Sequence, residues 1–319
     1  MVNEATLETQ FTPEELTELL DPQEHVSTPP DDPALRLSLL NYTSFMGCSQ
    51  DTYEAARRNL SQCYPDIELL SYYRVERQAR KLSGIITWEH YMCVDSHVGF
   101  TGPFADLEHC PDCGQSRYEE KDLEESAGER KVPRKVFTTF PAGPQLQARW
   151  KNPETAKDMF YRWEKTEGLR QEFAQYGIPL DVYDDILSGK AYLGLVDDGI
   201  IGEYDTVLLL STDGAQLYDH KDSNCWIYIW IVVDLGPDKH YKIRNILPGG
   251  IIPGPNAPKN LESFFFPGLA HVSALQREGL HIWDSYHQRR AISFLFLLLV
   301  LADSVAMAQI SGSVGVTTR

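Results

Sequence analysis

The spacing of hydrophobic positions changes along the chain and separates a helical first part from a later part rich in strands. Between residues 33 and 82 the apolar residues recur at roughly helical intervals, which predicts helices that bury one face. A second helical stretch is expected from about residue 153 to 176. Near the start, Thr12-Pro13-Glu14-Glu15 combines an N-cap residue, a proline at the first helical position and a glutamate at the third, which predicts a short helix.

From about residue 204 the pattern is typical of strands. Three stretches rich in Val, Ile, Leu, Tyr or Trp are divided by Asp, Asn, Gly and Pro, and they cover residues 206–212, 225–235 and 241–252. Consecutive strands of this kind favour an antiparallel meander. A helix is predicted for residues 261–278, and a buried strand or core helix for the continuous apolar run 291–302. The expected fold class is α/β or α+β.

Composition divides the chain further. The first residues are acidic and proline-rich, a composition that buries little core, so apart from the short helix we expect them to be largely disordered. The expected regions are 1–35 (disordered), 36–82 (helical), 83–118 (compact and Cys/His-bearing), 119–200 (an acidic linker and a helical segment) and 201–319 (the strand-rich core). No internal repeat is visible.

The charge of the chain limits how it could meet nucleic acid. Its 319 residues carry a formal net charge of −17, which argues against wrapping DNA over most of the surface, because phosphate contacts need clustered Lys and Arg. Any DNA contact must be local. The best local candidate is a small basic cluster, Arg130, Lys131, Arg134 and Lys135, although such a run is also typical of a solvated linker.

Several function classes are excluded by missing motifs. The N-terminus has no basic segment followed by an apolar core, so a secretory signal is not supported. The glycine-rich stretch at 249–254 lacks the Gly-Lys-Ser/Thr of a P-loop, and no G-x-S-x-G elbow is present. The apolar run before Asp303 is too short for a membrane span of about 20 residues. We expect a protein of the nucleus or cytosol.

Four potential metal ligands stand at short spacing. Cys93-x3-His97 is followed, after a turn-rich segment, by Cys110-x2-Cys113 and a glycine. Two chelating pairs joined by a loop can close a tetrahedral zinc site with no open position, which would hold the segment folded. His109 is a reserve ligand. The alternative is an ordinary fold with free cysteines, which is also the interpretation for Cys48, Cys63 and Cys225.

Two aspartates follow apolar strands. Asp213 comes after Val207 to Leu210 and precedes Gly214, and Asp303 ends the apolar run. A carboxylate at the end of a buried strand lies in a low-dielectric setting, where binding a divalent cation offsets its desolvation. Two such strands side by side could share metal for phosphoryl transfer. An aspartate before glycine is also a common turn residue, and Asp205, Asp219, Asp222 and Asp234 offer the same chemistry.

Three distinctive blocks stand in order along the chain. They are the segment 100–118 with His-Cys-Pro-Asp-Cys-Gly, the segment 210–217 with Ser-Thr-Asp-Gly followed by Cys225-Trp226, and the segment 250–259 with Gly-Ile-Ile-Pro-Gly-Pro-Asn-Ala-Pro-Lys. Together they resemble the CACTA (En/Spm) type of DNA transposase, particularly its fungal members. The link between the first two blocks, 131–137 and 144–147, also looks like the family. The resemblance covers about residues 60 to 310.

The resemblance implies the first part of an RNase H-like catalytic core, preceded by a zinc-knuckle region and helices. Asp213 matches the family's first acidic residue and Asp303 its second, with Mg or Mn as the catalytic metal. His97 stands where the family usually has a cysteine, and it can still bind zinc. No residue matches the third acidic position before the sequence ends at Arg319. We therefore expect the chain to be incomplete and inactive alone.

The expected function is metal-dependent cleavage and transfer of DNA strands by a nuclear cut-and-paste transposase, with structural zinc. The expected partners are DNA at the transposon ends and other transposase chains, with no membrane and no small-molecule substrate. The alternative is a non-catalytic zinc-binding module derived from a transposon, which contacts DNA or protein. A membrane-anchored protein is the weaker third interpretation.

Overall fold

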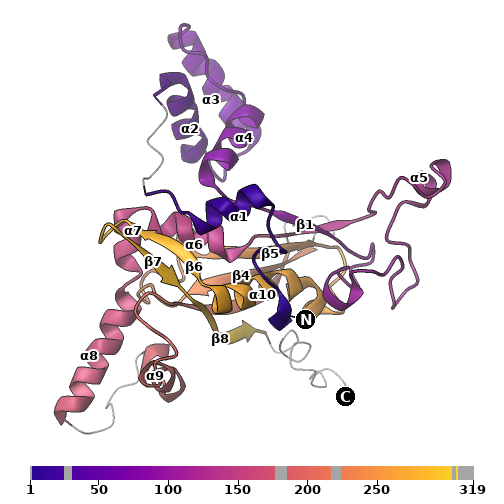
Figure 1. Cartoon of the computed structure of the whole chain (residues 1–319). Coiled ribbons are helices and arrows are strands. Elements are labelled where there is room, and N and C mark those ends of the chain that lie inside the picture. Colours follow the sequence, from indigo (N-terminus) through magenta and orange to yellow (C-terminus); the bar gives the residue numbers. More distant parts are fainter. Residues whose placement is uncertain (1, 25–30, 177–184, 217–223, 304–306, 308–319) are drawn as a thin grey trace. The chain divides into compact units, whose positions relative to one another are not determined.

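The computed structural model describes residues 2–24, 31–176, 185–216, 224–303 and 307 (Figure 1). Backbone contacts divide the chain into two compact units, one of residues 23–85 and one that combines 1–22 with 86–319. The expected boundary near residue 82 lies close to this division. The expected boundaries near residues 118 and 200 fall inside the larger unit.

The smaller unit contains three helices, α2 (Pro33–Ser44), α3 (Gln50–Cys63) and α4 (Tyr72–Ser83). The side chains of Asp32 and Ser49 accept the N-terminal N–H groups of α2 and α3, as N-cap residues do. Tyr53 is buried, and its hydroxyl donates to the backbone carbonyl of Leu70 at 2.9 Å. The helices predicted for this region are thus present and pack on one another.

The larger unit is built on a six-stranded sheet of order β1-β2-β5-β4-β3-β8. Its strands are β1 (Trp88–Tyr91), β2 (Val136–Thr139), β3 (Thr206–Gln216), β4 (Asn224–Val232), β5 (Leu247–Pro253) and β8 (Leu295–Ala302). Neighbouring strands are antiparallel except for β3 and β8, which are parallel. The fold is therefore mixed α/β, and β3-β4-β5 form the predicted meander. Residues 241–246 are not a strand, since they contain the 3₁₀ helix Ile243–Asn245.

Helices cover both faces of this sheet (Figure 1). Side chains of β3 alternate between the faces, because successive residues of a strand point to opposite sides. Leu208 and Leu210 pack in one cluster with α6 (Ala142–Trp150) and α10 (Leu261–Glu278), whereas Val207 and Leu209 pack in another with α9 (Lys190–Asp197). The bounds of α10 are those predicted. The helical stretch expected at 153–176 is split into α7 (Pro153–Asp158) and α8 (Tyr161–Tyr176), and the short α5 is Glu120–Glu125.

The apolar run 291–302 is not the single buried element that the sequence predicts. It is divided between β7 (Arg289–Ser293), which forms a hairpin with β6 (Leu280–Asp284), and β8. Strand β8 lies at the edge of the sheet, and its Leu299 and Leu301 are 46% and 36% exposed. No helix of the described part is both long and apolar enough to cross a membrane.

The acidic N-terminus contributes to the core, contrary to the expectation of a largely disordered segment for its described residues. Helix α1 (Pro13–Leu20) begins with the predicted capping box at Thr12. Its Leu19, together with Leu7 and Phe11, belongs to the same buried cluster as α6 and α10. Three widely spaced apolar side chains are enough to attach the segment to the core. The composition of the segment does not predict this attachment, because most of its residues are polar.

A fully buried ion pair joins the helices to the sheet. Arg162 of α8 is 0% exposed, and its Nε lies 2.6 Å from Oδ1 of Asp234, which follows β4. The other oxygen of Asp234 accepts the N–H of Val207 in β3, and the guanidinium also donates to Tyr192 and to the carbonyls of Gly202, Glu203 and Asp205. The approach to β3 is therefore fixed by one arginine.

Replacing one partner of this pair should destabilise the protein more than replacing both. Arg162→Met leaves a buried carboxylate without its cation, so we expect a loss of about 3–5 kcal/mol in the free energy of unfolding. Arg162→Met combined with Asp234→Leu should lose less than the single variant, because no unpaired charge remains. Urea unfolding followed by circular dichroism measures the free energy of unfolding of Arg162→Met, of Asp234→Leu and of the double variant. A loss in the double variant equal to the sum of the losses in the two single variants would contradict this interpretation.

Acid should also weaken the attachment of the N-terminal segment. His271 is fully buried, with Nδ1 2.9 Å from Oε1 of Gln10 and Nε2 3.0 Å from the N–H of Gly143, and burial lowers the pKa of His271 to about 3. An unfolded chain protonates this ring near pH 6.5, so stability should fall as the pH falls from about 6.5 toward 3. His271→Gln should reduce that slope by about one proton in unfolding curves recorded across this range. An unchanged slope would show that another group causes it.

Candidate metal centre and acidic pair

The first half of the Cys/His centre is a hairpin that continues from β1. Met92 bridges Gly99 antiparallel, and the N–H of Cys93 donates to the carbonyl of Val98. Ser96 occupies the left-handed region at a φ of 63°, which lets the chain reverse tightly between the two ligands. The turn therefore brings Cys93 and His97 to the same end of one hairpin.

The second half is a knuckle of the predicted type. His109 bridges Ser116, and the N–H of Gly114 donates to the carbonyl of Cys110. Gly114 has a φ of +70°, which a residue with a Cβ adopts only at a cost. The tight turn places Cys110 and Cys113 close together. His109, the predicted reserve ligand, is outside the group of four.

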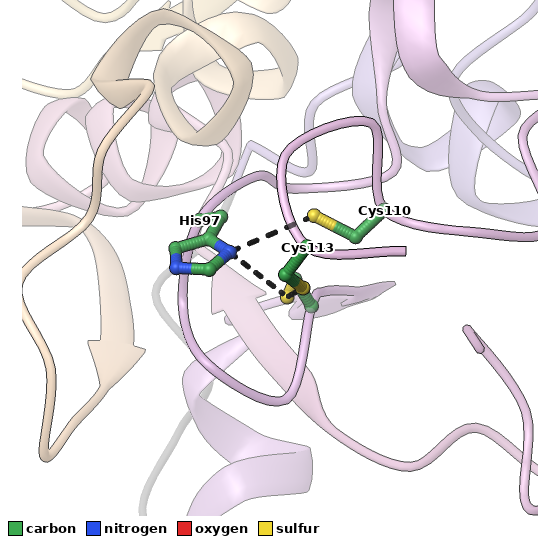
Figure 2. Close-up of side chains that lie close together, drawn as sticks. His97, Cys110 and Cys113 are labelled. Carbon is green, nitrogen blue, oxygen red and sulfur yellow. Dashed lines mark hydrogen bonds between the residues drawn. The ribbon is translucent and has the colours of Figure 1, made fainter. Parts of the chain in front are cut away.

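The four side chains converge on one point. The ligand atoms of Cys93, His97, Cys110 and Cys113 all lie within 4.8 Å of one another, and Figure 2 shows His97, Cys110 and Cys113 pointing together from their two loops. The Sγ atoms of Cys93 and Cys113 are 3.6 Å apart, and Nδ1 of His97 is 3.8 Å from Sγ of Cys93 and of Cys110. Tetrahedral zinc with Zn–S bonds of about 2.3 Å separates its sulfur ligands by about 3.8 Å. The set could hold a metal ion such as zinc.

The surroundings favour a structural centre over a reactive one. Cys93 and Cys110 are 1% and 2% exposed, while Cys113 lies at the surface. Burial raises the pKa of the Cys110 thiol to about 12, so a metal ion has to displace its proton. With four ligands from the protein, no coordination position is left for a substrate.

A lysine joins the centre to the sheet. Nζ of Lys135 donates to the carbonyls of Val94 and Gly254 and to the hydroxyl of Ser96. The N–H of Met92 donates to the carbonyl of Lys135, which directly precedes β2. The first hairpin is therefore held against both the start of β2 and the end of β5.

The basic cluster has largely internal partners, unlike a free phosphate-binding surface. Lys131 pairs with Glu108 at 2.6 Å, Arg130 pairs with Asp122 at 3.1 Å, and Nη1 of Arg134 donates to Oε1 of Gln115 at 2.7 Å. Lys135 donates its hydrogen bonds to the first hairpin and to Gly254. Each of the four cations thus has a partner within the fold, which makes them poor candidates for the main contact with DNA.

The two aspartates lie on neighbouring strands. Thr212 of β3 pairs in parallel with Ala302 of β8, and Asp213 and Asp303 follow these two residues. Adjacent strands are about 4.8 Å apart, so the two backbone positions are close. Asp213 is not the turn residue that an Asp-Gly pair often indicates, because it lies within β3 and pairs with Ile227 of β4. Its Oδ1 accepts the N–H of the next residue, Gly214, at 2.8 Å. The strands bring the two backbone positions close together. That the two carboxyl groups face one another stays a prediction.

Their setting differs from the prediction in one respect. Both Asp213 and Asp303 are exposed, whereas the sequence pattern predicts a low-dielectric position. The reason is that the buried part of β3 ends at Thr212 and that β8 is an edge strand. A cation at this pair would therefore be partly hydrated.

Two of the four alternative aspartates lie in the described part of the chain, and both have structural roles. Asp234 is the partner of Arg162, and Asp205 accepts the N–H groups of Gly202 and Phe294. Asp219 and Asp222 lie outside the described residues. Sequence reasoning missed the role of Asp234, since nothing near it in the chain indicates that Arg162 is its partner.

No protein-family model matches the chain, and no curated protein matches it either.

The Cys/His centre predicts one zinc per chain. Elemental analysis of protein purified without chelators should find it, and Cys110→Ser with Cys113→Ser should remove it, because two remaining ligands bind zinc weakly. Affinity should fall as the pH falls, since protons compete for the thiolates. The matched control is Cys48→Ser with Cys63→Ser, two exposed cysteines outside the centre.

Removing the metal should loosen the two hairpins first. Amide hydrogen exchange after chelation should rise in residues 92–118 more than in β3 and β4, whose cores do not depend on the ligands. Protein that contains no zinc, or that keeps full protection of 92–118 after chelation, would contradict the assignment.

Proposed function

We propose that this chain is part of a metal-dependent DNA strand transferase of the transposase type, acting in the nucleus on transposon ends. The observation that carries the proposal is the parallel pairing of β3 with β8, which brings Asp213 and Asp303 to neighbouring positions. Two carboxylates at adjacent strands are the beginning of a site for divalent cations.

The order of the strands supports an RNase H-like core. An antiparallel meander, β3-β4-β5, is followed by the long helix α10, and the chain returns to form β8 beside the first strand of the meander. The first acidic residue of such a core lies on the first strand and the second at the end of the returning strand, which are the positions of Asp213 and Asp303. This arrangement agrees with the resemblance of the Ser-Thr-Asp-Gly block.

The chemistry would be phosphoryl transfer assisted by Mg²⁺ or Mn²⁺. In such a reaction the carboxylates hold ions about 4 Å apart, one beside the attacking oxygen and one beside the leaving oxygen. Asp213 and Asp303 would hold cations at the sheet while the exposed side remains open to a DNA phosphate. Two carboxylates are an incomplete set, and within the described residues no third His, Cys, Asp or Glu forms a metal-type group with them.

The Cys/His centre would serve the same protein as a structural zinc site. Its hairpins join the sheet next to β2 and β5, on the side away from the acidic pair in the strand order. Zinc there would stabilise the segment 92–118 without taking part in the reaction.

A non-catalytic zinc-binding module, which contacts DNA or protein, is the second candidate. It is favoured by the exposure of both aspartates and by the complete Cys/His set, which needs nothing further to bind its metal. On this alternative the two aspartates would be ordinary surface residues, and divalent cations would bind to them no better than to other exposed carboxylates.

Manganese binding separates the two candidates. Titration followed by electron paramagnetic resonance should show one weak Mn²⁺ site that is lost in Asp213→Asn and in Asp303→Asn. The matched control is Asp106→Asn, an exposed aspartate outside the pair. Equal binding by all four proteins would favour the module.

Strand cleavage tests the activity itself. The chain alone should not nick DNA that carries transposon ends, because its carboxylate set is incomplete. The chain mixed with the C-terminal catalytic segment of a full-length CACTA-type transposase should nick it in Mn²⁺, and Asp213→Asn should abolish the activity. Nicking by the chain alone would show that one of its own residues completes the site. Absence of nicking in the mixture, with the segment active in its own protein, would argue against a transferase.

A further inference from the structure

Helix α4 is strongly basic, although the protein as a whole is strongly acidic. Its 12 residues contain Arg74, Arg77, Arg80 and Lys81 against one acid, Glu76. Residues 23–85 as a whole hold seven basic and eight acidic side chains, so nearly all of the net charge of −17 belongs to the rest of the chain. The local charge of α4 is therefore opposite in sign to that of the protein.

The basic residues share one face of the helix. Arg74, Arg77 and Lys81 lie three or four residues apart, and side chains at this spacing stand above one another on an α-helix. Together with Leu70, Tyr73 and Gln78 they line a shallow hollow of about 370 Å³. The face contains no carboxylate.

These cations have few partners in the protein. Among the described residues, no ion pair joins Arg77 or Lys81 to a carboxylate, and Arg74 has only a loose contact of 3.8 Å with the exposed Glu68. Arg80, off this face, is paired with Glu76 at 3.0 Å. This contrasts with the cluster at 130–135, in which every cation has a partner.

We propose that this face of α4 is a contact surface for double-stranded DNA, with Arg74, Arg77 and Lys81 bound to phosphates. An α-helix fits the major groove, and the neighbouring Tyr73 and Gln78, both exposed, are suited to contacts with sugars or base edges. The inference rests on the proposed function in that DNA is the partner, but it concerns binding, which needs neither metal nor cleavage.

Charge argues for DNA over an acidic protein. Three cations at a spacing of about 5–6 Å along a helix are comparable with the separation of phosphates along a strand. With Leu70 as its single aliphatic residue, the face lacks the apolar area that a protein interface of ordinary size buries at its centre. The larger acidic unit also repels DNA, so the contact has to be confined to a local surface such as this one.

Fluorescence anisotropy tests whether the full chain binds DNA through this face of α4. The probe is a labelled 20-base-pair duplex of arbitrary sequence, in a chelator-free buffer without divalent cations. Arg77→Gln with Lys81→Gln should weaken binding at low salt by about tenfold and reduce the dependence of log K on log salt by about two units, because two phosphate contacts are lost. The matched control, Arg36→Gln with Arg58→Gln, removes two exposed arginines from the same unit outside this face and should bind within twofold of the unaltered chain. Thermal unfolding of both variants checks that the helices remain folded.

Equal weakening by the two double variants would overturn the inference, since binding would then follow net charge alone. Competition by poly-aspartate as effective as competition by unlabelled duplex would also overturn it in favour of an acidic protein partner. A chain that binds through α4 but never cleaves in the completed mixture would refute the proposed transferase and leave the DNA contact intact.

Discussion

The buried pair of Arg162 and Asp234 is the constraint on which the larger unit most depends. An arginine and an aspartate with exposures of 0% and 1% are stable inside a protein only when their remaining hydrogen bonds are also satisfied. Here the pair contacts α9 through Tyr192, β3 through the N–H of Val207, and three carbonyls of the loop that enters β3. One interaction therefore fixes where the central strand begins and orients it relative to the helices on one face.

The course of β3 beyond this pair explains where the two candidate aspartates lie. The strand is largely buried up to Thr212 and pairs with β4 on one edge and with β8 on the other. It then reaches solvent at Asp213. Strand β8 ends at Ala302, the partner of Thr212, so Asp303 emerges beside Asp213. The Cys/His centre is attached to the opposite half of the sheet through Lys135. The sheet thus separates the Cys/His centre from the exposed acidic pair.

The sequence predicted most of the features that depend on local pattern. The capping box of α1, the bounds of α10, the meander and the convergence of Cys93, His97, Cys110 and Cys113 all follow from short-range spacing, and each is present. It missed the features that depend on distant partners. No spacing rule links Arg162 to Asp234, 72 residues apart, or attaches Leu7 and Leu19 to a core formed by later helices. It also misjudged the acidic pair as buried, because an apolar run such as 295–302 does not reveal whether another strand covers it.

The central claim is that the acidic pair Asp213 and Asp303 binds divalent cations at a site separate from a structural metal centre. Anomalous scattering from crystals grown with Mn²⁺ tests this claim most directly. Data at the zinc edge should show one peak among the Cys/His ligands, and data collected where manganese scatters should show a second peak in contact with the carboxylates of Asp213 and Asp303. Carboxyl oxygens more than about 8 Å apart could not jointly hold ions separated by about 4 Å. A well-ordered structure with those carboxylates on opposite faces, or with manganese only at unrelated surface acids, would contradict the account.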